Sequence, residues 1–201
     1  MVFEKEVIID CRGHLMGRLA SIVSKELLKG QKVVLVRTEE IIISGSIFRN
    51  RINFQFFLNK AMNTNPRRGP FHKRSPADMI KRTIRGMIPH RTKRGTSALK
   101  RLKAFEGVPP KYQRRKRVVI PDALVLVRLK PIRKRTRLGD LAEKFGWHHD
   151  ELIVRLEDKR KIHSHAYYTV KKAENKLKKQ AAENAKERLA EVTETLAGFG
   201  Y

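Results

Sequence analysis

The sequence is poor in cysteine and in long hydrophobic runs. Cys11 is the only cysteine, so we expect no intramolecular disulfide and no zinc site built on cysteine pairs, which fits a reducing compartment. The longest apolar run, Ala123 to Val127, is far shorter than the roughly 20 residues of a membrane-spanning helix. No signal-peptide core follows Met1. We therefore expect a soluble intracellular protein without a membrane partner.

Aromatic and acidic residues are scarce as well. Aromatics make up 7% of the chain, which has neither the aromatic octapeptide of an RRM domain nor the GxxG loop of a KH domain. This argues against recognition of unstacked bases by sequence and favours folded RNA recognised by shape and backbone. The 20 Asp and Glu face 46 Lys and Arg, for a net charge of +26. Such a charge repels itself unless an anionic partner neutralises it. Nucleic acid is the usual partner, and an anionic membrane surface is the main alternative.

The excess charge is concentrated in the middle of the chain. Residues 67–137 carry 24 basic and 3 acidic residues, whereas residues 138–201 carry 12 and 11. Residues 1–66 carry 10 and 6. A chain kept soluble by general surface charge would not concentrate it in one third, so the distribution indicates a polyanion-binding region.

The first part of the chain has the pattern of a strand, a helix and a second strand. Val7–Ile9 and Val33–Val36 are short apolar runs, typical of buried parallel strands. Between them, from Gly17 to Lys29, the apolar residues recur at helical spacing, and Gly30 ends the helix. This order predicts a right-handed βαβ unit and an α/β fold class.

Further elements follow from the same reasoning. Ser75 and Pro76 are a favourable helix start, and the helix after them places Lys81, Arg82 and Arg85 beside an apolar sector. That apolar sector contains Ile80, Ile84, Met87 and Ile88. Short strands are predicted at 41–43 and 123–129. A helix is predicted after the turn at 44–46, with Phe48, Ile52 and Phe56 at four-residue spacing, and further helices at 98–105, 138–145, 150–161 and 170–196.

The segment 13–18, GHLMGR, has the glycines of a phosphate-binding loop between strand and helix. It lacks the Lys and the Ser or Thr that a nucleotide-binding P-loop needs. We therefore prefer contact of His14 and Arg18 with an RNA backbone to hydrolysis of a nucleoside triphosphate. A tight turn with a solvated Arg18 remains an alternative.

Other signs of enzymatic chemistry are weak. Asp10, Glu39 and Glu40 stand near predicted strand ends, where α/β enzymes place catalytic groups but where ordinary polar residues also occur. The pairs His148-His149 and His163-Ser164-His165 have no Cys or carboxylates at familiar zinc-ligand spacing. We predict no catalytic residue, no metal and no cofactor. A phosphate-loop enzyme of RNA metabolism is the remaining enzymatic alternative.

The basic residues recur in stretches broken by Gly, Pro and single apolar residues. Loops of this kind can pass between RNA helices and contact their phosphates. Charge runs also occur as solvated faces or localisation signals, but stretches with so few acids between them would repel one another without counter-charge. The basic stretches of this chain span residues 67–68, 72–74, 91–94, 111–117 and 128–137.

Several blocks of the sequence resemble one known family. They are GHLMGRLAS at 13–21, ISGSIFRN at 43–50, NTNPRRGPFH at 63–72, IRGMIPHRTKRG at 84–95, ALKRLKAFEGVPP at 98–110 and RLKPIRK at 128–134. In order and content they are similar to the L-thirteen family of large-subunit ribosomal proteins, in its eukaryotic cytosolic type. The resemblance covers roughly residues 5–150, and the IRGMIPH block followed by RLKAFEG is its most specific part.

The resemblance implies a three-layer α/β/α fold around a small, mostly parallel sheet. Residues 1–150 would form the rRNA-binding α/β domain with basic loops, and residues 151–201 a helical C-terminal extension. That extension would contact rRNA or neighbouring ribosomal proteins. The implied function is structural: scaffolding of rRNA during assembly in the nucleolus and in the mature cytosolic ribosome. A free RNA-binding regulator is the alternative outside the ribosome.

The residues expected to bind rRNA come from two sources. The resemblance implies contacts by Arg18, Arg49, Arg67, Arg68, His72, Arg74, Arg85, His90, Lys93 and Arg94. The glycine segment, the helix faces and the basic stretches add Arg12, His14, Lys81, Arg91, Arg101, Arg115, Lys116, Arg117, Arg133 and Lys134.

Overall fold

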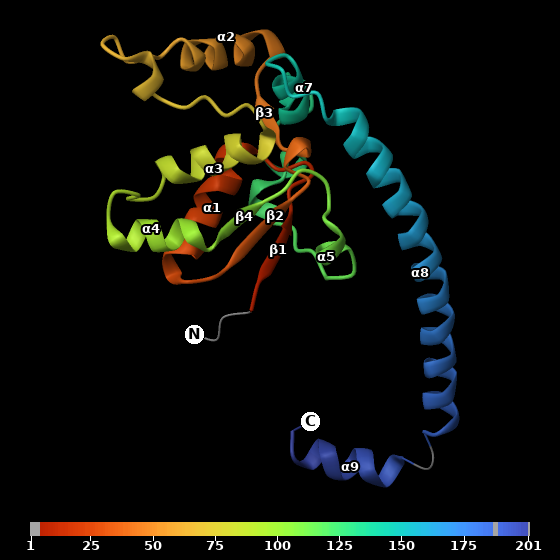
Figure 1. The fold of residues 1–201 in the computed structure, drawn as a ribbon. Helices are drawn as coiled ribbons and strands as arrows, with labels where there is room; N and C mark the ends of the chain where they lie inside the picture. The colour runs from red at the N-terminus through yellow and green to blue at the C-terminus, as the bar shows by residue number, and fades with distance from the viewer. Residues whose placement is uncertain (1–4, 187–188, 201) are drawn as a thin grey trace. The chain divides into compact units, whose positions relative to one another are not determined.

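Three short parallel strands lie at the centre of the fold in the computed structural model, which describes residues 5–186 and 189–200 (Figure 1). They are β1 (Val7–Asp10), β2 (Val33–Val36) and β4 (Leu102–Ala104), in the order β1-β2-β4. Val33 of the central strand lies opposite Val7 on one side and Leu102 on the other. The predicted α/β class, with a small and mostly parallel sheet, is confirmed.

Alternate residues of the sheet face two different cores. Val33 and Leu35 pack with the main core, whereas Val34 and Val36 pack with Tyr112 on the opposite face. This alternation follows from the two-residue period of a strand. In Figure 1, α1 (Met16–Lys29), α3 (Pro76–Gly86) and α4 (Lys93–Lys100) lie on one side of the sheet and α5 (Pro110–Gln113) on the other. The sheet is therefore the middle of three layers.

The end of α1 and the start of α3 lie where the sequence indicates. Helix α1 (Met16–Lys29) ends at Gly30, whose φ of 121° is open to glycine but strained for other residues. Helix α3 (Pro76–Gly86) begins after Ser75, whose side chain accepts a hydrogen bond from the backbone N–H of Asp78. Helix α4 (Lys93–Lys100) follows after a short turn.

A second, two-stranded sheet holds the segment that leads to the basic loops. Strand β3 (Ile42–Ser44) pairs antiparallel with β5 (Arg135–Arg137). Helix α2 (Ile47–Leu58) follows β3, and its buried Asn50 donates to Thr136 Oγ1 at 2.9 Å. Short 3-10 turns lie at Thr38–Glu40, Pro66–Arg68 and Pro121–Ala123.

Two element predictions between residues 98 and 129 are wrong. The helix predicted over 98–105 ends at Lys100, and Leu102–Ala104 instead forms β4, because pairing with the open edge of β2 satisfies its backbone. The strand predicted over 123–129 is largely a short helix, α6 (Val125–Arg128). The backbone of Ala123 and Val125 bonds to the glycine segment, and Leu126 beyond it is 89% exposed with no sheet to join.

Met87 corrects the predicted apolar sector of α3. The helix ends at Gly86, so Met87 turns outward and is 43% exposed, whereas Ile80, Ile84 and Ile88 are buried as predicted. The position of the helix end depends on the following turn, and it makes one of the four side chains predicted to be apolar and packed point outward instead.

The chain divides into two compact units, one up to Glu157 and one from Asp158 on. Helix α7 (Leu138–Glu143) lies in the first unit, where the sequence predicts a helix over 138–145. The helices predicted at 150–161 and 170–196 are instead α8 (Asp150–Asn184), one uninterrupted helix with no buried residue, followed by α9 (Ala190–Gly198). No helix among the described residues has the length and apolar character needed to cross a membrane. The functional boundary predicted after residue 150 stays a prediction.

Candidate nucleic-acid interface

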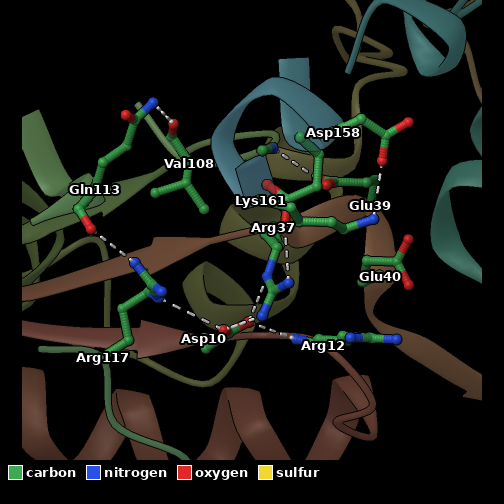
Figure 2. A network of polar contacts seen from close by, with 12 residues as sticks. Asp10, Arg12, Arg37, Glu39, Glu40, Val108, Gln113, Arg117, Asp158 and Lys161 are labelled. Carbon is green, nitrogen blue, oxygen red and sulfur yellow. Dashed lines mark hydrogen bonds and ion pairs between the residues drawn. The ribbon is translucent and has the colours of Figure 1, made fainter. Parts of the chain in front are cut away.

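The carboxylate at the end of β1 is held by arginines. Arg37 donates from Nε to Asp10 at 2.9 Å, pairs with it through Nη2, and reaches Glu157 Oε1 at 3.1 Å through Nη1. Figure 2 shows Arg117 approaching the same carboxylate, at 3.8 Å, from another direction. Burial alone would raise the pKa of Asp10, but the hydrogen bonds and charge of Arg37 outweigh it and hold the pKa below its ordinary value. Asp10 thus joins the end of β1 to the residues after β2.

The neighbouring carboxylates also have partners within the fold. Glu39 is 2% exposed and accepts the backbone N–H of Gly107 at 2.9 Å. Burial raises the pKa of Glu39 to about 7, although the Gly107 hydrogen bond acts in the opposite direction. Glu40 pairs at 2.9 Å with Arg137, which also binds Asp150. The strand-end carboxylates therefore hold elements together, and these contacts account for their positions.

The glycine segment presents a turn whose histidine faces inward. His14 is fully buried, and its Nε2 accepts the backbone N–H of Ile120 at 3.0 Å. Nδ1 therefore carries the proton and donates to the carbonyl oxygen of Arg12 at 3.1 Å. Burial lowers the pKa of His14, which favours the neutral ring. The predicted rRNA contact of His14 is corrected: its polar atoms are satisfied inside the fold and cannot reach a phosphate. Arg12 and Arg18 on either side are exposed.

A second predicted contact residue also has an internal role. Arg101 donates from Nε and Nη2 to the carbonyl oxygen of Leu27, at 3.2 and 2.8 Å. This oxygen belongs to the last turn of α1, where a cation compensates the negative end of the helix dipole. We therefore assign Arg101 to the fold and leave it out of the interface. Arg115 and Arg117 have acidic partners too, Glu6 at 3.0 Å and Asp10 at 3.8 Å, and are weaker candidates.

Most of the remaining candidates are exposed around the ends of α2, α3 and α4. Figure 1 shows the segment after α2 returning to the start of α3, and a turn joining α3 to α4. The returning segment carries Arg67, Arg68, His72 and Arg74, and the turn and first residues of α4 carry His90, Arg91, Lys93 and Arg94. Arg133 and Lys134 lie on a third exposed loop, Lys116 is exposed on the segment after α5, and Arg49 is exposed on α2.

A cleft of about 500 Å³ lies between the returning segment and α3. Phe57, Phe71 and Lys73 line it together with Lys81, Arg82 and Arg85 of α3. Two of these cations, Lys73 and Arg82, are absent from the predicted contact set. Both had a signal in the sequence: Lys73 belongs to the basic stretch 72–74, and Arg82 lies on the basic side of α3.

The aromatic side chains of this region contact one another and a neighbouring arginine. Arg82 lies over the ring of Phe57, with 3.2 Å from Cζ to the ring centroid, a cation–π arrangement. Burial, and then the charge of Arg85, lowers the pKa of Arg82. The ring of His72 packs edge-on against Phe57 at 4.6 Å. His72 is half-buried, so it contributes to this aromatic cluster in addition to any contact with RNA.

The acidic side chains of this α/β fold are largely engaged in ion pairs within the chain, and its exposed loops carry many basic side chains. These two features define a polyanion-binding protein. In agreement with this class, residues 4–111 match the family model described as Ribosomal protein L13. Because the match covers more than half of the chain, the protein belongs to the ribosomal protein L13 family.

Membership of this family settles the general function. The protein is a structural constituent of the large ribosomal subunit and takes part in translation as a component of a ribonucleoprotein. The family is in general structural and non-enzymatic, and it implies rRNA and other ribosomal proteins as partners. The resemblance seen in the sequence is thus confirmed at the level of the family.

Proposed function

We propose that the protein scaffolds rRNA of the cytosolic large subunit by neutralising phosphates where rRNA segments converge. The basic charge of residues 67–137 carries this proposal, because the fold distributes it over exposed loops at several places on the first compact unit. Each Lys or Arg that meets a phosphate releases counterions, which gives affinity without sequence specificity.

Three groups of residues form the proposed interface. The first is the returning segment with Arg67, Arg68, His72, Lys73 and Arg74; the second is α3 with the following turn, from Lys81 to Arg94; the third is the loop with Arg133 and Lys134. Arg12, Arg18, Arg49, Arg115, Lys116 and Arg117 lie outside these groups and are proposed as additional contacts.

The proposed location follows from this role. Assembly onto rRNA in the nucleolus would precede work in the cytosolic ribosome. Helix α8 beyond Glu157 carries many basic residues and no buried one, which suits contact with rRNA or a neighbouring ribosomal protein.

Sedimentation of a cell lysate on a sucrose gradient tests the proposal, with and without a high-salt wash and RNase. We expect the protein to follow the large subunit through the wash and to be released when the RNA is digested. Protein found mainly at the top of the gradient would overturn rRNA scaffolding as the main role and favour a free RNA-binding regulator.

A further inference from the structure

The cleft between the returning segment and α3 has the size and lining of a ligand site. Its volume of about 500 Å³ falls within the range of pockets that enclose small ligands. Phe57 comes from α2, Phe71 from the returning segment, and Leu99 and Leu102 form an apolar part of the lining. Residues of α2, the returning segment, α3, α4 and β4 therefore shape one concave surface.

Phe71 is an aromatic residue of the cleft lining whose ring the fold leaves in solvent. The side chain is 81% exposed at the edge of the cleft, with Pro70 beside it in the lining. An exposed aromatic ring at the edge of a cleft presents a face on which another planar group can stack. Phe57 differs, since its ring is already covered by the guanidinium of Arg82. One aromatic face is thus available, and it is that of Phe71.

The charges around the cleft are strongly one-sided. Across residues 5–186 and 189–200, no acidic side chain pairs with Lys73, Arg82 or Arg85. Lys81 approaches the one acid of the lining, Asp78, but only at 3.5 Å. Asp78 is also engaged by the hydroxyl of Ser75, from which it accepts at 3.1 Å. The cleft consequently attracts an anion next to an exposed aromatic ring.

We propose that this cleft binds one unpaired nucleotide of RNA, with its base stacked on Phe71 and its phosphate between Lys73 and Arg85. The proposal rests on the proposed function and adds the kind of RNA element that is recognised. A base within a duplex is stacked on both faces and cannot meet the ring, whereas an extruded base can. Stacking on an aromatic ring tolerates any base, so no sequence motif for base reading is required.

Hairpin RNAs that differ by a single unpaired nucleotide test the proposal. The full-length protein is titrated, at one salt concentration and with fluorescence anisotropy as the readout, against a fully paired stem. The same stem carrying a one-nucleotide bulge of A, C, G or U is titrated alongside it. We expect at least one bulged stem to bind more tightly than the paired stem. Phe71→Ala should weaken binding of that bulged stem about 5- to 150-fold and leave the paired stem unchanged.

Two variants serve as controls. Phe71→Trp keeps an aromatic face and should keep the preference for the bulge. Phe48→Ala removes an aromatic side chain that is 70% exposed on α2 and does not line the cleft, and it should change neither affinity. Because Phe71 and Phe48 are both largely in solvent, neither substitution should disturb the core, which circular dichroism would verify.

The possible outcomes distinguish the nucleotide site from the proposed scaffolding of rRNA through phosphates. Equal affinity of the wild-type protein for all stems would overturn the nucleotide site and leave phosphate-based scaffolding standing. No binding of any stem would contradict both. Unchanged affinities in Phe71→Ala would also overturn the site and favour a protein partner for the cleft. Binding of AMP that Phe71→Ala abolishes, together with equal affinity of the wild-type protein for bulged and paired stems, would assign the cleft to a free nucleotide instead of RNA.

Discussion

At the scale of residues, arginine serves two opposite purposes in this protein. Arg37 and Arg137 are partly buried between carboxylates, and their loss would leave acidic groups without compensation. Arg94 is exposed at the start of α4 and has no acidic partner in the described part of the chain. The sequence shows the same residue type in both cases, so the difference follows from position in the fold.

The first prediction concerns the salt dependence of RNA binding. Arg94→Ala should reduce the slope of log affinity against log salt concentration by about one, because one phosphate contact is lost. Binding to large-subunit rRNA is measured over a series of salt concentrations. Arg101→Ala is the matched control: it removes a charge that binds Leu27 O, so it should lower stability and leave the slope unchanged. An unaltered slope in Arg94→Ala would remove that residue from the interface.

The second prediction concerns the buried Glu39. Its pKa is raised from an ordinary value of 4.5 to about 7, so the folded state holds a proton that the unfolded state releases between these values. Ionisation of the buried Glu39 therefore destabilises the folded state. This destabilisation is absent below pH 4.5 and reaches its full size above pH 7. Glu39→Gln cannot ionise, so relative to wild type it should gain up to about 3 kcal/mol between pH 4.5 and pH 8.

Urea unfolding of both proteins across that range provides the measurement. The quantity compared is the difference in free energy of unfolding between variant and wild type, which cancels the contribution of other groups. A difference that stays constant with pH would show that Glu39 ionises in the folded protein as it does in water.

At the scale of elements, the turn between α3 and α4 decides where several basic side chains point. The turn folds back so closely that a Cβ on Gly95 would lie 2.0 Å from the carbonyl oxygen of Pro89 and 2.5 Å from its carbon. A side chain cannot occupy that space, so the glycine permits the close approach of the turn to α4. This gives a physical reason for the glycine that ends the block at 84–95.

The third prediction follows from that contact. Gly95→Ala should destabilise the protein by roughly 1–3 kcal/mol or more, because the backbone of the turn must move. The displaced turn should also weaken rRNA binding. Gly86→Ala is the matched control, since a Cβ there meets no atom within 4 Å and α3 should be unchanged or gain about 0.4–1 kcal/mol. Thermal unfolding of the two variants would show the contrast, and equal melting temperatures would contradict it.

At the scale of the whole molecule, the start of α8 belongs to the first unit. Asp150 binds Arg137 at 2.9 Å, Ile153 packs against the main core, and Glu157 binds Arg37 at 3.1 Å. These contacts lie at the carboxyl ends of the strands, where Asp10 and Glu39 are also held. The functional boundary predicted after residue 150 would separate them from their partners.

The fourth prediction uses two truncated chains. A chain ending at residue 157 should keep a stability close to that of the full-length protein. A chain ending at residue 149 should lose about 2 kcal/mol or more, because it lacks two ion pairs and the buried part of Ile153. Urea unfolding of both chains gives the comparison. Equal stability of the two would place the structural boundary at 150, as the sequence indicated.

The class of fold, the family and the basic character of the middle third could all be predicted from the sequence. The fold class depends on local periodicity and on caps such as Ser75 and Gly30, the basic character on charge counts, and the family on the resemblance of blocks such as IRGMIPH. All of these are properties of short segments. The strand Leu102–Ala104 could not be predicted in this way, because only the open edge of β2 makes an extended conformation favourable there. The roles of His14 and Arg101 likewise depended on acceptors and donors distant in the chain.

Tertiary structure alone decided which basic residues are available and what surrounds them. Phe57, Phe71 and Arg85 come from α2, a loop and α3, and nothing in their spacing predicts that they line one cleft. The sequence contains few aromatic residues and no linear motif for reading bases, and the structure does not change that observation. Long-range packing brings an exposed ring next to unpaired cations, because distances between such residues are set by the core and not by the chain that connects them.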